Sequence, residues 1–582
     1  MLSPRLKSDI RELWNDFWAG GLSNPITAIE QITYLIFLKR LEDLDNQRQK
    51  DARKNDRSYT SVYEGDFELL QTRRTDESKE APKIPKAHFR WSHIKTLKDD
   101  ALLQHIRGPV FDWLKLLDES GERMRDAVFV IPNASLLERA IEKIDQLFIE
   151  ERNQDTVGDI YEMLLSEIAE AGKNGQFRTP RHLIRAMCDL VDVKMGDKVC
   201  DPACGTSGFL INAFQHVLMQ QSEPDQLQFL ADGTPLNANG NKLKQHPDWS
   251  AFFYGFDIDR TMVRLGWMNM ILHGLENPNI EYANTLGKRW NGNVADSGQW
   301  RGAFDVVLAN PPFAAKLDKN DLGATLAEAG TNQSELLFLE LILQLLNPDT
   351  GRAAVIVPEG VLFGSSKAHR NLREKLVKEN NLKAIISLPN NVFQPYSGVK
   401  TSIIVFERGS VTEQVWFYEV ANDGYTLNAK RAEDFDHNDL WDMQVQFRLR
   451  YGMPPPAFVE ASTPELWKEL QDTDANTYFQ PIFAEFAAEV EADDEQETSE
   501  SISTLSLESL TTKSLGEDKH WRATAVEIID NAYNMSANRY KPFALQAVEY
   551  DEPQDIISDL RTIEKDIVEG LKRLENRLKA NS

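Results

Sequence analysis

The chain has 582 residues, too many for one hydrophobic core, so roughly two to four domains are expected. Hydrophobic residues make up 41% of it and no apolar run approaches the ~18 residues of a membrane span, which predicts a soluble, cytoplasmic protein with no membrane partner. The net charge of −26 disfavours a protein that binds nucleic acid alone, because it repels phosphate; either DNA is not the substrate or a basic partner supplies most phosphate contacts.

The first residues and the cysteines argue for a cytoplasmic protein. The segment MLSPRLKSDIRELWNDFW is charged and lacks the apolar region of a signal peptide. The three cysteines, Cys188, Cys200 and Cys204, provide no disulfide framework, and CDPAC does not have the spacing of a CxxC motif. We therefore expect reduced cysteines and no metal site.

Residues 1–150 are predicted to form a helical N-terminal domain. Ser8 and Asp9 suit the start of a helix that ends at Gly20, and a broad apolar stripe follows from Ile29 to Leu41. Residues 53–86 are polar and predict a long loop, after which SLLERAIEKIDQL is helical again. No catalytic cluster is found here, so this domain is expected to clamp a partner or DNA.

Residues 151–435 alternate between short apolar strands and helices. Two helices, VGDIYEMLLSEIAEAG and TPRHLIRAMCDLV, precede this series. The predicted strands are DKVCDPACG, SAFFYGFDID, FDVVLANPPF, GRAAVIVPEGVLF, NLKAIISLPN and KTSIIVFER. Such alternation predicts a doubly wound α/β fold, a parallel sheet with helices on both faces, into which the polar residues 221–249 are inserted.

The C-terminal part carries weaker patterns. Residues 436–545 form a separate region with an acidic, Ser/Thr-rich linker near 490–518. Residues 546–582 have apolar side chains at helical spacing and predict an amphipathic helix for subunit contact.

The first chemical motif is VCDPACGTSGFLI, a strand that runs into a glycine-rich turn and a helix. Gly205 and Gly208 let the backbone approach a ligand. Asp201 at the strand end would repel phosphate but attract an ammonium group, which favours a zwitterionic ligand such as S-adenosylmethionine. A tight structural turn is the alternative interpretation.

The second motif is YGFDIDRTM at the end of the next strand. Asp259 suits a helix N-cap, so Asp257 is the better candidate to bind the ribose of an adenosine. Asn284, in the next turn, is predicted to contact the adenine edge.

The third motif is Asn310-Pro311-Pro312-Phe313 after the strand FDVVLA. The prolines fix the backbone, so the Asn310 side-chain oxygen and the Pro311 carbonyl form two adjacent acceptors that suit an exocyclic amino group. Phe313 offers a face for stacking a planar base, a contact worth about 1–3 kcal/mol. Together the three motifs predict in-line transfer of a sulfonium methyl group to a planar amine, mainly through positioning and desolvation.

These motifs resemble those of a known family. DPACGTSGF and NPPF are similar to the donor-binding and catalytic motifs of DNA adenine-N6 methyltransferases. GQFRTPRHLI, LPNNVFQPYSGVKTSIIVF and YNMSANRY resemble segments of the modification subunit of type I restriction–modification enzymes. The resemblance implies a class I methyltransferase-like sheet domain with a helical N-terminal domain and a helical C-terminal tail.

The resemblance also implies site residues. The residues expected to contact S-adenosylmethionine are Gln176, Phe177, Arg178, Thr179, Pro180, Arg181, Asp201, Gly205, Thr206, Ser207, Gly208, Asp257 and Asn284. The catalytic residues Asn310, Pro311, Pro312 and Phe313 would hold a target adenine that has been flipped out of the duplex.

The implied partners are double-stranded DNA, a DNA-specificity subunit, a restriction subunit that cleaves and translocates, and a second copy of the chain. No G-x-x-x-x-G-K-[ST] motif occurs, so cleavage would belong to another subunit. Three alternatives stay open: a cytosine-N4 methyltransferase, a protein-glutamine methyltransferase, and a non-catalytic scaffold that binds the donor.

Overall fold

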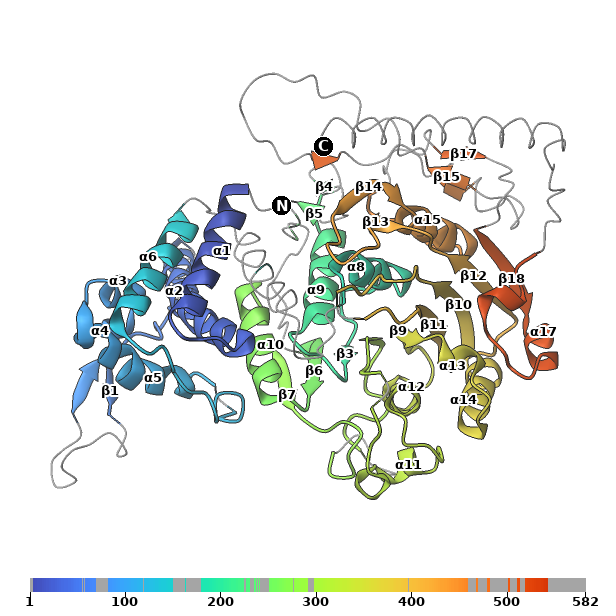
Figure 1. The fold of residues 1–582 in the computed structure, drawn as a ribbon, viewed down its shortest axis with the longest axis horizontal. Helices are drawn as coiled ribbons and strands as arrows, with labels where there is room; N and C mark the ends of the chain where they lie inside the picture. Colours follow the sequence, from blue (N-terminus) through green and yellow to red (C-terminus); the bar gives the residue numbers. More distant parts are fainter. Residues whose placement is uncertain are drawn as a thin grey trace, which may run out of the picture. The chain divides into compact units, whose positions relative to one another are not determined.

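The fold of the chain comes from a computed structural model (Figure 1). It describes residues 4–54, 56, 58–69, 82–118, 120–149, 163, 179–223, 227–230, 235–236, 238, 240, 251–275, 277–290, 298–313, 315–395, 397–458, 467–468, 479–481, 501–502, 510–512 and 519–542. Described residues up to Lys541 belong to one compact unit. The helix predicted at 157–172 (apart from Met163), most of the 490–518 linker and the helix predicted at 546–582 lie outside the described residues.

The N-terminal region is helical, as predicted. Its helices are α1 (Pro4–Ala19), α2 (Pro25–Lys54), α3 (Trp91–Ile94), α4 (Asp99–His105), α5 (Phe111–Leu116) and α6 (Ala134–Ile149), with the short turns η2 (Lys86–Phe89) and η3 (Ile106–Val110). The expected start of α1 at Ser8 is wrong, because Pro4 already takes a first-turn position, where a missing N–H costs nothing. The loop expected at 53–86 contains a small hairpin of β1 (Asp66–Glu68) and β2 (Lys83–Pro85).

A nine-stranded sheet forms the centre of the described chain, in the order β18-β12-β10-β11-β9-β8-β3-β6-β7. Its strands are β3 (Val199–Asp201), β6 (Phe253–Asp257), β7 (Asn279–Tyr282), β8 (Val306–Ala309), β9 (Arg352–Pro358), β10 (Asn381–Ser387), β11 (Thr401–Glu407), β12 (Gln414–Glu419) and β18 (His520–Thr524). The five adjacent strands β9, β8, β3, β6 and β7 are parallel to one another.

The prediction of an all-parallel sheet is wrong in the other half. β11 runs antiparallel to β9 and β10, and β18 runs antiparallel to β12. The described residues between β10 and β11 contain no helix, and an antiparallel pair needs no helical crossover. The strands β7, β12 and β18 were not predicted; β7 is a short edge strand with one buried side chain, so its sequence lacks an apolar run.

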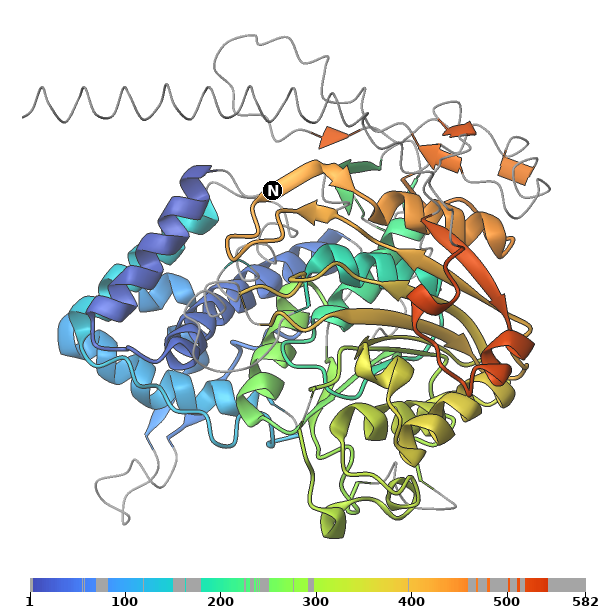
Figure 2. The same cartoon turned by 45° about the vertical axis from the view of Figure 1, so that its right-hand side comes forward.

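Helices cover both faces of the sheet, as Figures 1 and 2 show and as predicted. Val306 and Leu308 of β8 pack into one hydrophobic cluster, whereas Val307 and Ala309 pack into another, because side chains alternate along a strand. The first cluster includes α8 (Arg181–Leu190), α9 (Gly208–Gln220), α10 (Arg260–Leu272) and α15 (Leu440–Arg450). The second includes α12 (Ser334–Leu345), α13 (Gly360–Phe363) and α14 (Lys367–Lys378).

Several short elements lie outside this sheet. They are β4 (Gln228–Leu230), β5 (Pro235–Leu236), η7 (Lys319–Asp321), α11 (Ala324–Ala327), β13 (Asp423–Tyr425), β14 (Glu433–Asn438), β15 (Phe479–Pro481), β16 (Ser501–Ile502), β17 (Leu510–Thr512), α17 (Ala525–Asp530) and η9 (Ala537–Arg539). β4 of the predicted insertion pairs with β5 and β16, and β17 pairs with β15. Two described parts of the expected linker are therefore paired strands.

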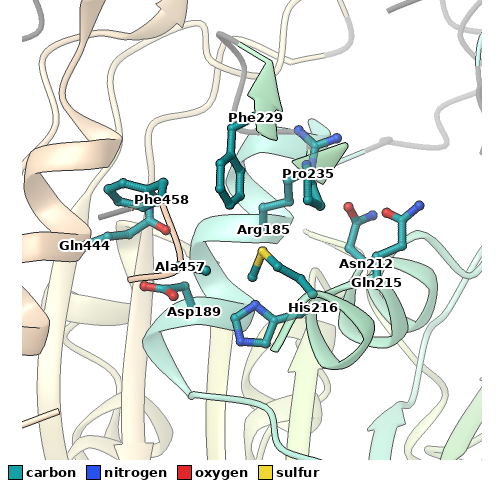
Figure 3. Close-up of a pocket in the computed structure, with 11 residues that line it drawn as sticks. Arg185, Asp189, Asn212, Gln215, His216, Phe229, Pro235, Gln444, Ala457 and Phe458 are labelled. Atoms are coloured by element: carbon teal, nitrogen blue, oxygen red, sulfur yellow. The ribbon is translucent and has the colours of Figure 1, made fainter. Parts of the chain in front are cut away.

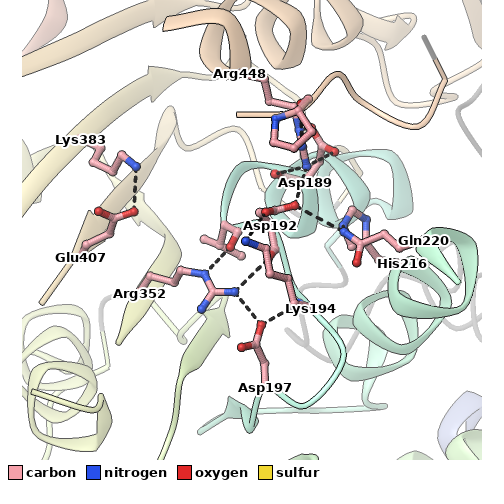
Figure 4. A network of polar contacts seen from close by, with 12 residues as sticks. Asp189, Asp192, Lys194, Asp197, His216, Gln220, Arg352, Lys383, Glu407 and Arg448 are labelled. Atoms are coloured by element: carbon pink, nitrogen blue, oxygen red, sulfur yellow. Dashed lines mark hydrogen bonds and ion pairs between the residues drawn. The ribbon is translucent and has the colours of Figure 1, made fainter. Parts of the chain in front are cut away.

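Buried charges fix α8 against the sheet and α15 (Figure 4). The Arg448 guanidinium of α15 lies 2.9 Å from the Asp189 carboxylate of α8 and 3.0 Å from that of Asp192. Arg352, the first residue of β9, donates to the Asp192 carbonyl at 2.8 Å and to Asp197 at 2.6 Å. Since a buried ion pair is costly to break, this network holds the whole helix in one position.

All three cysteines are free and buried, as expected. Among the residues that the structure describes, no helix combines the length and the apolarity that a bilayer crossing requires.

Candidate active site

The three predicted motifs come together at one edge of the sheet. β3 is parallel to both neighbours, with Asp201 level with Gly255 of β6 and Cys200 level with Val307 of β8. The carboxyl ends of these strands therefore share an edge, with Asp257 and Asn310 on either side of Asp201. In an open α/β sheet, ligands bind where the chain order changes direction, as it does at β3.

The glycine-rich turn after β3 is held by the neighbouring strand. Gly205 and Ser207 both have positive φ, +51° and +66°, and Ser207 directly precedes α9. The Gly205 N–H donates to the Asp257 carboxylate at 2.9 Å, and the Cys204 N–H donates to the Phe256 carbonyl at 2.9 Å. A Cβ at Gly205 would meet no atom within 4 Å, so open space lies beside this turn.

Helix α10 braces the turn from the other side. A Cβ at Gly266 would lie 2.5 Å from Ser207 Oγ and 2.9 Å from the Gly205 carbonyl, so only glycine allows this approach. Asn269 Nδ2 donates to the Thr206 carbonyl at 2.9 Å. The sequence analysis missed both residues; a polar Asn269 within the apolar run WMNMIL was the available signal.

Asp201 is almost fully buried, and no cationic side chain among the described residues forms a salt bridge with it. Its Oδ1 accepts a hydrogen bond from the Ala203 N–H at 3.0 Å. Burial, and then the nearby charge of Asp257, raises the pKa of Asp201 to about 8. A carboxyl group in this state gains most from a cationic ligand, which would restore its ionised form.

Asp257 and Asn284 lie at the ends of β6 and β7. The Asp257 carboxylate accepts from the N–H groups of Gly205 and Asp259, at 2.9 and 2.8 Å, and burial raises its pKa. Asp259 caps α10 as expected, by accepting from the N–H groups of Thr261 and Met262. Asn284 is exposed just beyond β7, and its carbonyl accepts from the Gly287 N–H.

Asn310 reaches across to the start of α8. Its Nδ2 donates to Thr179 Oγ1 at 2.9 Å, and its Oδ1 is buried with no hydrogen-bond partner among the described residues. Pro311 is buried and Pro312 is exposed, while the Pro312 carbonyl accepts from Ser334 Oγ at 2.7 Å. Phe313 is partly buried and packs against the cluster that contains α8 and α9.

The start of α8 is held in place by His182, which directly follows the predicted donor contacts. Pro180 directly precedes the helix, and Arg181 is its first residue. His182 Nε2 lies 2.8 Å from the Asp423 carboxylate, which also pairs with Arg431. Burial raises the Asp423 pKa, but these partners more than offset it, so the pKa is lowered. Gln176, Phe177 and Arg178 lie outside the described residues.

A hollow lies beside α8 and α9 (Figure 3). Arg185, His216, Phe229 and Phe458 are among its lining residues, whereas Asp201, Asp257 and Asn310 are not. Burial lowers the pKa of His216 to about 4, so the hollow presents a neutral imidazole. In the described part of the chain, no group of three or more His, Cys, Asp or Glu side chains is arranged to hold a metal ion.

Two protein-family models match the chain. The model described as N-6 DNA Methylase matches residues 152–545, and the model described as HsdM N-terminal domain matches residues 6–144. The first range includes every strand of the large sheet. The second includes the helices α1–α6, apart from the start of α1 and the end of α6.

Known proteins with similar sequences and structures point the same way. The methylase subunit of the type I restriction enzyme EcoEI from Escherichia coli is 31% identical over 416 residues, which cover 69% of this chain and 74% of that protein. A modification subunit of a putative type I restriction enzyme from Vibrio vulnificus YJ016 is 25% identical, with a TM-score of 0.56 over 74% of this chain and 87% of that chain. A chain from a study of assembly and conformational transition of the type I R-M system has the same fold, with 24% identity and a TM-score of 0.59 over 99% of both chains.

Proposed function

The chain belongs to the N-6 DNA methylase family as a type I restriction–modification methylase subunit, and on that premise we propose that it methylates adenine N6 in double-stranded DNA. S-adenosylmethionine is the proposed donor. The observation that carries the proposal is Asn310, whose buried Oδ1 has no hydrogen-bond partner among the described residues and stands one strand away from Asp201. A buried acceptor without a donor is costly, so it suits a ligand that brings an N–H group.

The residues at the sheet edge fit the donor. Asp201 suits the ammonium group of the donor, and Asp257 suits its ribose. The open space beside Gly205 lets the donor lie against the backbone of the glycine-rich turn. When bound, S-adenosylmethionine supplies an electrophilic methyl group. Asp257 already holds the Gly205 N–H, so it would act both on the turn and on the ligand.

Asn310 and Phe313 would receive the flipped adenine. The Asn310 Oδ1 accepts from the exocyclic amino group, which keeps electron density on the nitrogen, and Phe313 stacks on the base. Pro311 and Pro312 keep this segment rigid because they fix φ. Excluding water and aligning nitrogen with the methyl carbon then account for catalysis.

The proposed assembly contains a DNA-specificity subunit, a restriction subunit and a second copy of this chain. The net charge of −26 supports this arrangement, since a chain so acidic needs other subunits to meet DNA phosphates. The relatives are themselves subunits of type I restriction enzymes.

Methyl transfer from radiolabelled S-adenosylmethionine to DNA tests the proposal. The chain together with its specificity partner is expected to yield N6-methyladenine on nucleoside analysis. Asn310→Ala is expected to lower the transfer rate by about 100- to 1,000-fold, by analogy with the loss of one transition-state hydrogen bond, while donor binding changes little. Asn347→Ala is the control and is expected to keep full activity, because the Asn347 N–H donates to the Phe304 carbonyl just before β8, at the end of that strand opposite Asn310.

The other outcomes distinguish the alternatives. N4-methylcytosine as the product would identify a cytosine methyltransferase, and label on glutamine side chains would identify a protein methyltransferase. Donor binding without any transfer would identify a scaffold, and each of these results would contradict the proposed function.

A further inference from the structure

We propose that Thr179 is a positioning residue that holds the Asn310 amide with its oxygen toward the substrate amine. The inference rests on the proposed function, since it assigns a task within the same site. It differs from the donor contact that the sequence predicts for Thr179.

The geometry joins two distant parts of the chain. Thr179 lies just before α8, Asn310 follows β8, and 131 positions separate them. Thr179 is only 7% exposed, and its Oγ1 accepts from Asn310 Nδ2 at 2.9 Å. On the other side of the same amide, Oδ1 is buried and has no hydrogen-bond partner among the described residues. One amide therefore has its donor side occupied and its acceptor side available.

The chemistry of an amide makes this orientation matter. A half-turn about the last side-chain bond exchanges Oδ1 and Nδ2 at almost no steric cost. Only the orientation with Oδ1 toward the substrate can accept from an amino group; the reverse would set donor against donor. The Thr179 hydroxyl stabilises the productive orientation because it accepts the Nδ2 hydrogen that would otherwise be buried without a partner. A hydroxyl can also donate to Oδ1 in the reverse orientation, so the substrate amine, which only Oδ1 can accept, completes the selection.

The position of Thr179 is itself fixed. Pro180 takes extended backbone angles, φ −55° and ψ 137°, which turn the chain into α8. Two residues after Pro180, His182 contacts Asp423 at 2.8 Å and stacks on Tyr425 with ring centroids 4.6 Å apart. A hydroxyl on such an anchored segment can hold a partner in one orientation.

Two substitutions separate the hydroxyl from the rest of the side chain. Thr179→Val keeps the shape and removes the acceptor, whereas Thr179→Ser keeps the acceptor and removes a methyl group. In the full complex, at saturating S-adenosylmethionine and DNA, single-turnover methylation is expected to slow by about 10- to 100-fold for Thr179→Val and by less than about 3-fold for Thr179→Ser. The donor dissociation constant, from equilibrium dialysis, is expected to stay within about 2-fold for both variants.

A second readout does not depend on catalysis. Thr179→Val and Asn310→Ala remove the same hydrogen bond, so their effects on the melting temperature of the chain are expected to be non-additive in a double-mutant cycle. Thr33→Val is the matched control, because Thr33 is fully buried in α2 and its hydroxyl donates to the Ile29 carbonyl at 2.7 Å. Its effect on the melting temperature is expected to be additive with that of Asn310→Ala, and the methylation rate is expected to stay unchanged.

Each contrary result overturns the proposal. An unchanged single-turnover rate in Thr179→Val would remove the positioning role, and a raised donor dissociation constant with an unchanged saturated rate would make Thr179 a donor ligand. Equal loss in Thr179→Ser and Thr179→Val would assign the effect to packing, and additive melting temperatures would show that the contact is absent. A wild-type complex that never methylates adenine would contradict the proposed function, and the cycle would still decide whether the Thr179–Asn310 contact exists.

Discussion

At the scale of single residues, the buried carboxyl group of Asp201 favours a cationic ligand. Its pKa of about 8 means that it is mostly protonated at pH 7 when no cation is near. An ammonium group opposite Asp201 would lower that pKa, so binding of S-adenosylmethionine at pH 7 is expected to release close to one proton. Titration calorimetry in two buffers of different ionisation enthalpy measures this number, and Asp201→Asn is expected to release almost none.

A ligand-free measurement supplies the control for Asp201. Because its pKa in the folded chain lies above the unfolded value of about 3.9, the carboxyl group loses stabilising free energy as pH rises from about 4 to 8. Asp201→Asn is therefore expected to raise the melting temperature more at pH 8 than at pH 5. In the calorimetric experiment, equal proton release by the wild-type chain and Asp201→Asn would contradict the proposed contact between Asp201 and the ammonium group.

Asp257 binds the glycine-rich turn and is also proposed to bind the donor. Asp257→Ala leaves the Gly205 N–H without its acceptor and loosens the turn, so the donor dissociation constant is expected to rise by about 10- to 100-fold. The saturated rate of methyl transfer is expected to change much less, and equilibrium dialysis with rapid-quench kinetics separates the two. A lower saturated rate at unchanged affinity would place Asp257 in the chemical step instead.

At the scale of elements, the approach of α10 to the glycine-rich turn sets the shape of the proposed donor site. Gly266→Ala would place a methyl group 2.9 Å from the Gly205 carbonyl, so the turn must move. We expect a loss of about 1–3 kcal/mol in folding free energy, typical of overpacking, together with weaker donor binding. Gly360→Ala in α13, where a Cβ meets no atom within 4 Å, is the control; it is expected to leave donor binding unchanged and to cause no loss of folding free energy, with a gain of up to about 1 kcal/mol.

The same element shows what the sequence could and could not predict. Alternating strands and helices placed Asp201, Asp257 and Asn310 at strand ends, because parallel strands share a carboxyl edge. Gly266 and Asn269 were not found, since their tasks depend on a helix packing against a turn some 60 positions away in sequence. The strand β11 was predicted, but its antiparallel direction was missed for a similar reason: strand direction depends on the connection, which the apolar pattern of TSIIVF does not encode.

At the scale of the whole molecule, net charge is expected to govern contact with DNA. The isolated chain, at −26, is expected to bind double-stranded DNA weakly and with a shallow dependence on salt. Adding the specificity subunit is expected to tighten binding and to steepen the salt dependence, because counterions are then released from the DNA. Fluorescence anisotropy over a salt series measures both; tight, steeply salt-dependent binding by the chain alone would contradict the division of labour.

The packing of α10 against the N-terminal helices limits how the chain can be divided. Arg264 of α10 pairs with Glu30 of α2 and donates to the Arg123 carbonyl, while Trp267 and Phe37 lie 5.6 Å apart between ring centroids. A fragment that began after residue 149 would leave a buried guanidinium facing solvent and an indole uncovered. Recombinant truncation or exchange of N-terminal regions between relatives therefore has to carry a compatible α10 surface along with it.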